Sequence, residues 1–219
     1  QDRKALHQAI WNFNESPIAI IVENNVVEIF NGFAIDENKQ LLKRLGGNET
    51  LNDFTYFELV TGKTWEKYND DINHKNRVDY RLLENIEAVQ KRLKEKGLTQ
   101  TTANALLGKV IFFRYLIDRN VRLNYQEKEL WNNEDLCNCL SNRNDFVAFI
   151  RHIENKDTGF NGDLFRISES EFSTIDQDAL DILIRLLRSE EISTGQQSLF
   201  DMYDFSILPI EFISNMYEK

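Results

Sequence analysis

The sequence contains few of the residues that interrupt regular structure. Only 2 prolines and 9 glycines occur among 219 residues, so the composition gives little sign of a linker, a low-complexity tract or a disordered segment. Hydrophobic residues make up 42% of the chain and charged residues 28%, which is ordinary for a globular protein. We therefore expect one substantial folded domain, or one domain with an appendage.

Long apolar runs are also missing. The longest nearly apolar stretch, Val110 to Ile117, is interrupted by Arg114 and is far too short to cross a bilayer. The first residues lack the basic segment, apolar run and small-residue cleavage site of a secretory signal. The sequence predicts a soluble, cytoplasmic protein with no membrane partner. Because it starts at Gln1 and ends at Lys219 inside a predicted helix, we expect both ends to lie within a longer protein.

Metal-binding residue types are scarce. Cys137 and Cys139 are the only cysteines, and His7, His74 and His152 are scattered along the chain. A structural zinc ion needs four closely organised ligands, and two cysteines are too few for a disulfide framework. We therefore predict no metal site, and we expect the two cysteines to be partly buried helix residues.

Positive charge is in short supply. Lys and Arg number 26 against 36 Asp and Glu, which gives a formal charge of −10. A duplex-binding module usually gathers basic residues to neutralise phosphates. The chain is therefore not expected to be a main DNA-binding surface. Lys91, Arg92, Lys94 and Arg122 could still touch the DNA backbone. The alternative is a solvated helix end, where cations suit the helix dipole.

The spacing of apolar residues predicts a mainly α fold. A helix at 4–14 and strands at 18–22 and 26–30, closed by Asn31-Gly32, form the expected β-hairpin element. Beyond it the pattern predicts short helices at 39–45, after the capping residue Asp53, and around Trp65 and Tyr68. Two long helices are predicted next, from Val78 to Gly97 and from Thr99 to about Asn120. Further helices are predicted at 127–140, at 144–155, after a capping box at 174–177, and from Pro209. Loops are expected at 157–163 and 193–197. The predicted architecture is a multi-helix bundle (51–219) with a small N-terminal α/β element of helix plus β-hairpin (1–50).

The helix that begins at Thr99 carries a segment that is apolar nearly all round, Val110 to Ile117. Such a helix is covered on several sides, so we expect it at the centre of the bundle. Arg114 and Asp118 lie four residues apart and could form an ion pair, in which Arg119 is a second candidate. If Arg114 is buried, removing Asp118 would leave an uncompensated charge.

Catalytic motifs are absent from the sequence. No Gly-x-Ser-x-Gly elbow and no glycine-rich phosphate loop occurs, so we predict no catalytic residue in this chain. A restriction-type nuclease would need two or three carboxylates around a metal ion with a Lys nearby on a strand. Glu23 and Glu28 are the carboxylates that the predicted strands offer, and Glu23 has no such Lys beside it. They remain the residues of an alternative, metal-dependent nuclease.

Three segments resemble motifs of large type IIG restriction–modification methylases. The run 107–119 resembles their aromatic-rich helix ending in Leu–acid–Asp–Arg, with Ile117 in place of the acid. Residues 160–165 resemble Asn-Gly-Gly-Leu-Phe, with Asp163 in place of the second Gly. Residues 203–218 resemble Tyr-Asp-Phe-Ser followed by Leu-Pro-Val-Glu and Ile-Tyr-Glu, with Ser214 where a Gly is usual. The three matches follow in the family's order over about half of the chain.

The resemblance implies a role that needs no active site in this chain. In the family a nuclease-like domain comes first, then a helical connector, then the methyltransferase domain and a target-recognition domain. The chain would be the connector, with its neighbouring domains and DNA as partners. S-adenosylmethionine and the Asn-Pro-Pro-Tyr-type loop would belong to the domain beyond Lys219, which would methylate adenine after base flipping. Residues 4–33 also resemble the closing helix and strands of nuclease-like domains. A protein-interaction domain unrelated to DNA is the remaining alternative.

Overall fold

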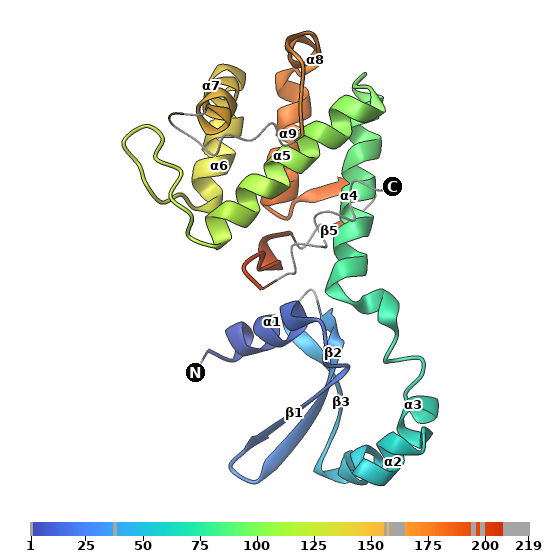
Figure 1. Cartoon of the computed structure of the whole chain (residues 1–219). Helices are drawn as coiled ribbons and strands as arrows, with labels where there is room; N and C mark the ends of the chain where they lie inside the picture. The colour runs from blue at the N-terminus through green and yellow to red at the C-terminus, as the bar shows by residue number, and fades with distance from the viewer. Residues whose placement is uncertain are drawn as a thin grey trace. The chain divides into compact units, whose positions relative to one another are not determined.

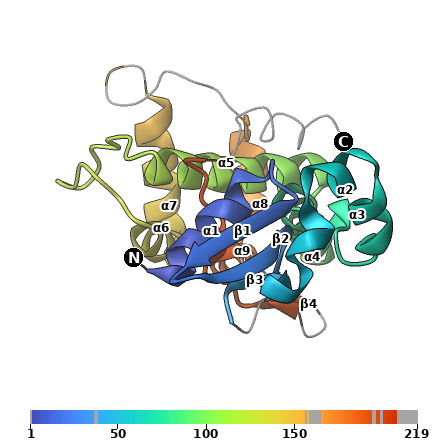
Figure 2. The same cartoon turned by 90° about the horizontal axis from the view of Figure 1, so that it is seen from below.

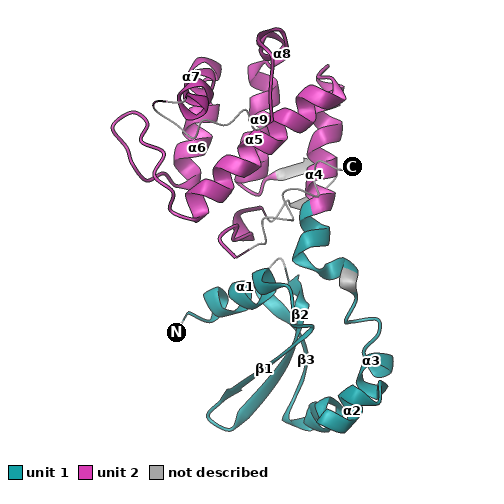
Figure 3. Ribbon diagram, viewed as in Figure 1, with its two compact units in different colours: residues 1–82 teal, residues 83–219 magenta. Residues whose placement is uncertain are grey.

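A three-stranded antiparallel sheet organises the first of two units, residues 1–82, in the computed structural model (Figures 1 and 3). The second unit, residues 83–219, is helical. The structure describes residues 2–36, 39–155, 157, 165–193, 196–197 and 200–207. The fold is mainly α with a small α/β element, as the sequence predicts.

The predicted helix and hairpin open the chain. Helix α1 (Arg3–Phe13) begins where the Asp2 side chain accepts a hydrogen bond from the N–H of Lys4, at 3.0 Å. Strand β1 (Ile18–Glu23) pairs with β2 (Val26–Asp36) through a turn at Asn24 and Asn25. Both turn residues have positive φ, 48° and 66°, a conformation that Asn tolerates. Views from the side and from below place α1 along one face of the sheet (Figures 1 and 2).

Asn31-Gly32 does not close the second strand, contrary to the prediction. The N–H of Gly32 donates to the carbonyl of Pro17 at 2.9 Å, and a Cβ on Gly32 would overlap the carbonyl oxygen of Ser16. The Asn31 side chain donates to the carbonyl of Asp71 at 2.5 Å and accepts from the N–H of Phe33 at 2.9 Å. Glycine here permits a close approach of two backbone segments, and the strand continues past it.

The helix predicted at 39–45 is wrong, because this segment forms strand β3 (Leu41–Gly47) beside β2. Its buried residue Leu42 donates its backbone N–H to Nδ1 of His7 on α1, at 3.0 Å. The apolar residues of the segment fit a helix as well as a strand when they are taken alone. Pairing with β2 decides between the two, since strand preference depends on the neighbouring strand.

The opposite face of the sheet is covered by the residues that follow β3. The 3-10 helix η1 (Asn48–Phe54), α2 (Tyr56–Val60) and α3 (Lys63–Lys67) bring Phe54 and Tyr68 onto Ile29. A further 3-10 turn, η2, spans His74–Asn76. The predicted division at residue 50 therefore falls inside the first unit, which extends to Leu82. Asp53 caps no helix; its carboxylate accepts hydrogen bonds from Tyr68 (2.9 Å) and Lys67 (2.7 Å).

Two long helices begin the helical part of the chain. Helix α4 (Val78–Glu95) ends before Gly97, whose φ of 95° suits glycine. Helix α5 (Gln100–Asp118) is capped by Thr99, which accepts from the N–H of Thr102 at 3.1 Å. Buried residues lie on every side of α5, which confirms it as the central helix.

Four shorter helices lie around α5 in the described part of the second unit. They are α6 (Asn133–Leu140), α7 (Arg143–Glu154), α8 (Glu169–Thr174) and α9 (Gln177–Leu187). The capping box predicted at 174–177 is wrong: the box is formed by Ser168 and Glu171 at α8, and Asp176 caps α9. The segment predicted as a loop at 193–197 contributes to a small hairpin, β4 (Glu191–Ser193) with β5 (Gln196–Gln197). The 3-10 turn η3 spans Phe200–Met202.

Some predictions lie outside the described residues, namely the final helix from Pro209 and most of the loop at 157–163. Within the described part of the chain, no helix combines the length and the apolar character that crossing a bilayer requires.

Candidate functional site

The predicted ion pair on the central helix is formed and largely buried. Nε of Arg114 lies 2.8 Å from Oδ1 of Asp118, and their side chains are 9% and 15% exposed. The two residues are one helical turn apart on α5, so the helix itself positions them. Nη1 of Arg114 is buried and has no hydrogen-bond partner among the described residues.

The second oxygen of Asp118 holds a segment that lies far away in the sequence. Oδ2 accepts a hydrogen bond from the backbone N–H of Phe205, at 3.1 Å. Asn85 on α4 donates its side-chain amide to the hydroxyl of Tyr203, at 3.0 Å. Tyr203 is 1% exposed and Phe205 0%. We name these contacts the 203–205 anchor: residues 203–205 held by Asn85 and by the Arg114–Asp118 pair.

The anchor joins two of the motifs that the sequence singles out. Asp118 belongs to the 107–119 run, and Tyr203 and Phe205 begin the 203–218 segment. Their rings pack on Phe200, at centroid distances of 5.6 and 5.4 Å. Of the remaining motif, at 160–165, the described residue is Phe165, whose ring lies 6.4 Å from that of Phe112 on α5.

The electrostatics of the anchor favour a structural role for Asp118. Burial raises the pKa of Asp118 above its usual value of 3.8, and the Arg114 charge and the Phe205 N–H offset this only in part. Burial of an ion pair costs desolvation energy, so the pair itself need not stabilise the fold. Removing one partner is a different matter, because the other charge is then left uncompensated.

Arg119 does not take part in the ion pair. Its guanidinium lies over the ring of Tyr115, 4.4 Å from the centroid. This is a cation–π contact between residues four apart on the same helical face. The spacing along the sequence makes Arg119 a second candidate for the ion pair with Asp118, and spacing alone cannot distinguish the two arginines.

The predicted DNA-backbone contacts do not share one surface. Lys91, Arg92 and Lys94 are exposed on the last turns of α4, whereas Arg122 follows the C-terminal end of α5. Helix α5 has 19 residues and is therefore about 28 Å long at 1.5 Å per residue. Arg92 lies 4.0 Å from Glu95, and Arg122 lies 3.5 Å from Glu129. The cations are thus separated and partly matched by neighbouring carboxylates.

The residues of the nuclease alternative are not gathered into a metal site. Glu28 is 2.5 Å from Arg3, and Glu23 is exposed at the end of β1. Glu28 also lines a cavity of about 540 Å³ with Asp36 and Asp71, but basic side chains share its walls. Among the described residues, no group of three His, Cys, Asp or Glu side chains could hold a metal ion.

The two cysteines are buried on α6, as predicted. Burial raises the pKa of the Cys137 thiol to about 11 and that of Cys139 to about 12. Both groups are therefore protonated at neutral pH and are poor nucleophiles.

No protein-family model, no curated protein and no solved structure matches the chain. The resemblance to type IIG methylases stays a prediction from the sequence motifs.

Proposed function

We propose that the chain is a non-catalytic helical connector of a large adenine-specific DNA methyltransferase of a restriction–modification system. It positions the S-adenosylmethionine-dependent catalytic domain that follows it, and it acts in the cytoplasm, where the DNA substrate is found. Its partners are the neighbouring nuclease-like and methyltransferase domains of the same protein, and DNA in the complete enzyme. The observation that carries the proposal is the 203–205 anchor, in which Asp118 of one motif binds the backbone of Phe205 in another.

The anchor suits a segment that leads into another domain. A fully buried aromatic side chain contributes roughly 1.5–3 kcal/mol of burial free energy, and Tyr203 and Phe205 are both fully buried. The hydrogen bond to Asp118 also fixes the backbone between them. Together these contacts hold the last described segment of the chain against the helical unit, and a segment fixed in this way suits a connector.

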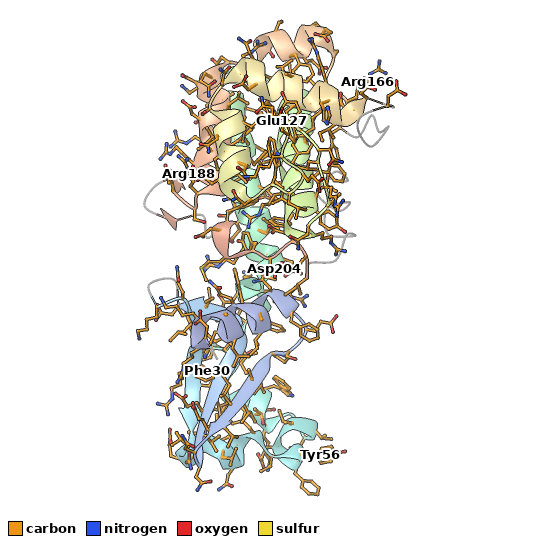
Figure 4. All side chains as sticks on the ribbon, turned by 90° about the vertical axis from the view of Figure 1, so that its left-hand side faces the viewer. Phe30, Tyr56, Glu127, Arg166, Arg188 and Asp204 are labelled. Atoms are coloured by element: carbon orange, nitrogen blue, oxygen red, sulfur yellow. The ribbon has the colours of Figure 1, made fainter. Side chains whose placement is uncertain are left out.

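The first unit has a surface that suits a neighbouring domain. Tyr56 and Phe57 on α2 are 74% and 75% exposed, and Val60 is 65% exposed; Figure 4 shows Tyr56 pointing outward. Exposed apolar groups that lie together on a surface are typical of protein contacts. A nuclease-like domain preceding the chain would supply such a contact.

DNA binding has a secondary place in this proposal. The formal charge of −10 opposes a strong interaction with phosphates, and the exposed cations Lys91, Arg92 and Lys94 occupy one end of α4. The connector can line the DNA path at that end, while the target-recognition and catalytic domains supply most of the affinity for DNA.

The first test is the sequence that follows Lys219 in the complete gene product. An S-adenosylmethionine-binding motif and an Asn-Pro-Pro-Tyr-type loop are expected within the next domain. Their absence would overturn the proposal and favour an interaction domain unrelated to DNA.

The second test measures adenine methylation by the complete enzyme with the anchor altered. Asp118→Asn is expected to lower the rate of methylation at least tenfold, while S-adenosylmethionine still binds the catalytic domain. The reason is that a weakened anchor no longer positions the catalytic domain correctly. A loss of about 1.4 kcal/mol in the activation free energy corresponds to this tenfold factor. Asp181→Asn, on the exposed side of α9, is the matched control and is expected to methylate at the normal rate. Equal rates for the two variants would contradict a positioning role.

A further inference from the structure

A second cavity, this one in the helical unit, lies at the hairpin that connects α5 to α6. The hairpin's backbone is closed by two hydrogen bonds of 3.1 Å between Tyr125 and Lys128. Its turn residues, Gln126 and Glu127, have φ of 50° and 60°; Figure 4 labels Glu127. Such a turn normally uses Asn-Gly or Asp-Gly, and other residues are strained there. Strain of this kind is often found where a loop contributes to a binding site.

Two aromatic rings form walls of the cavity, which has a volume of about 280 Å³. The rings of Tyr125 and Trp131 are 6.0 Å apart with 53° between their planes. Trp131 is stacked on Phe149, at 4.5 Å and 11°, and Tyr125 packs on Phe149 and His152. Both rings are therefore held in place by the α7 side chains behind them.

The charge of the cavity wall is negative. Asp135 and Asp145 are the acidic residues that line it, and Lys128 is the basic one. The ammonium of Lys128 binds both oxygens of Asp135, at 2.6 and 2.7 Å. Asp145, in the first turn of α7, is thus left as the carboxylate that can receive an added cation.

The combination of two fixed rings and a carboxylate recognises cations. A ring face attracts an ammonium or guanidinium group within about 6 Å, and removal from water strengthens this attraction. The volume is below that of a typical drug-sized site and suits a single side chain. A nucleic acid is disfavoured, because its phosphates would face Asp145 together with the exposed Glu127.

We infer that this hairpin cavity binds a lysine or arginine side chain of a partner polypeptide, with the alkyl stem lying against the rings of Tyr125 and Trp131 that line the cavity and the charged head at Asp145. The site is separate from the 203–205 anchor and does not depend on the methyltransferase proposal. The two cationic head groups share the same chemistry, and their relative affinities for the cavity distinguish them.

The test uses the indole N–H signals of the whole ¹⁵N-labelled chain, which contains 3 tryptophans. Trp131→Phe identifies the Trp131 signal. The probes are the Nα-acetyl amides of lysine, of arginine and of the neutral isostere norleucine. We expect saturable shifts of the Trp131 signal with a cationic probe, no shift with norleucine, and unshifted Trp11 and Trp65 signals. The tighter of the two cationic probes identifies the head group. Similar shifts with norleucine, or none with either cation, would overturn the proposal.

Two substitutions separate charge recognition from general folding. Asp145→Asn is expected to weaken binding of the cationic probe about 3- to 10-fold, the range for one carboxylate at a partly exposed site. Asp181→Asn removes a carboxylate from the exposed face of α9 and is expected to bind the probe normally. An unchanged circular dichroism spectrum checks that both variants fold. Equal affinity of Asp145→Asn and the unaltered chain would overturn the assignment of Asp145 as the cation's partner.

Discussion

The two units differ in how completely they cover their apolar side chains. The first unit leaves Val22 65% exposed and Phe57 75% exposed around a core of Ile29, Phe54 and Tyr68. In the second unit the helix α5 is covered on every side, and the large rings of Phe149, Phe200 and Phe205 are fully buried. The first unit is also the shorter of the two, and small domains bury a smaller fraction of their surface.

This difference indicates that stability and contact surface are divided between the units. The helical unit has the larger buried core, in which these aromatic rings lie among many buried leucine and isoleucine side chains, and the burial of such groups stabilises a fold. The sheet unit keeps apolar surface available, which in a folded protein usually serves a contact with another domain or partner. Substitutions can test each half of this comparison.

The largest expected difference in stability is between removing a buried phenylalanine and removing an exposed one. Phe205→Ala should destabilise the helical unit by about 3–5 kcal/mol, the usual cost of removing a buried aromatic ring. Phe57→Ala on α2 should change the stability of the sheet unit by no more than about 0.5 kcal/mol, because its ring is exposed. Hydrogen exchange of peptides from each unit measures both effects. A small effect of Phe205→Ala would mean that the 203–205 anchor is dispensable.

A smaller effect is expected at the buried ion pair. Asp118→Ala leaves Arg114 uncompensated and should cost about 3 kcal/mol. The double variant Arg114→Met, Asp118→Leu should recover most of this loss, since apolar replacements of a buried pair are often neutral. Denaturant unfolding of the three proteins gives the comparison. A double variant as unstable as Asp118→Ala would show that the hydrogen bond to Phe205, which both variants lack, matters more than the charge.

The smallest expected effect is a pH dependence confined to the sheet unit. Burial, followed by the charge of Arg3, lowers the pKa of His7 below 6.5. The unfolded chain therefore binds more protons than the folded unit just below pH 6.5, so stability is full above that pH and falls as the pH drops through the folded-state pKa.

Hydrogen exchange of the first unit between pH 7.5 and 5 measures this dependence. His7→Gln keeps a hydrogen-bond acceptor for Leu42 and removes the titration, so its exchange should lack the added pH dependence. The same dependence in His7→Gln would assign the effect to another group.

The long helices could be predicted because their pattern is local. Val78, Leu82, Ile86, Val89 and Leu93 recur at helical spacing, and all of them are buried. The strand β3 could not be predicted, since its apolar residues obtain their strand conformation from β2. The hairpin before α6 was missed for another reason: Gln126-Glu127 lacks the Asn-Gly or Asp-Gly pair that marks such turns.

The candidate site was predictable only in part. The spacing of Arg114 and Asp118 predicts their ion pair, and the structure contains it. The partner of the second Asp118 oxygen lies 87 residues further along the chain, a contact that no periodicity can indicate. Asn85 carries no local signal either, because an amide on a helix is usually a solvated residue.

The close approach of Gly32 to Pro17 has a chemical consequence. An Asn-Gly pair deamidates when the glycine nitrogen attacks the asparagine side-chain amide. In the first unit the Gly32 N–H is bound to Pro17, and the Asn31 side chain is bound to Asp71 and Phe33. The attack therefore requires the sheet to open. The rate at which Asn31 deamidates in storage thus reports how often this unit opens.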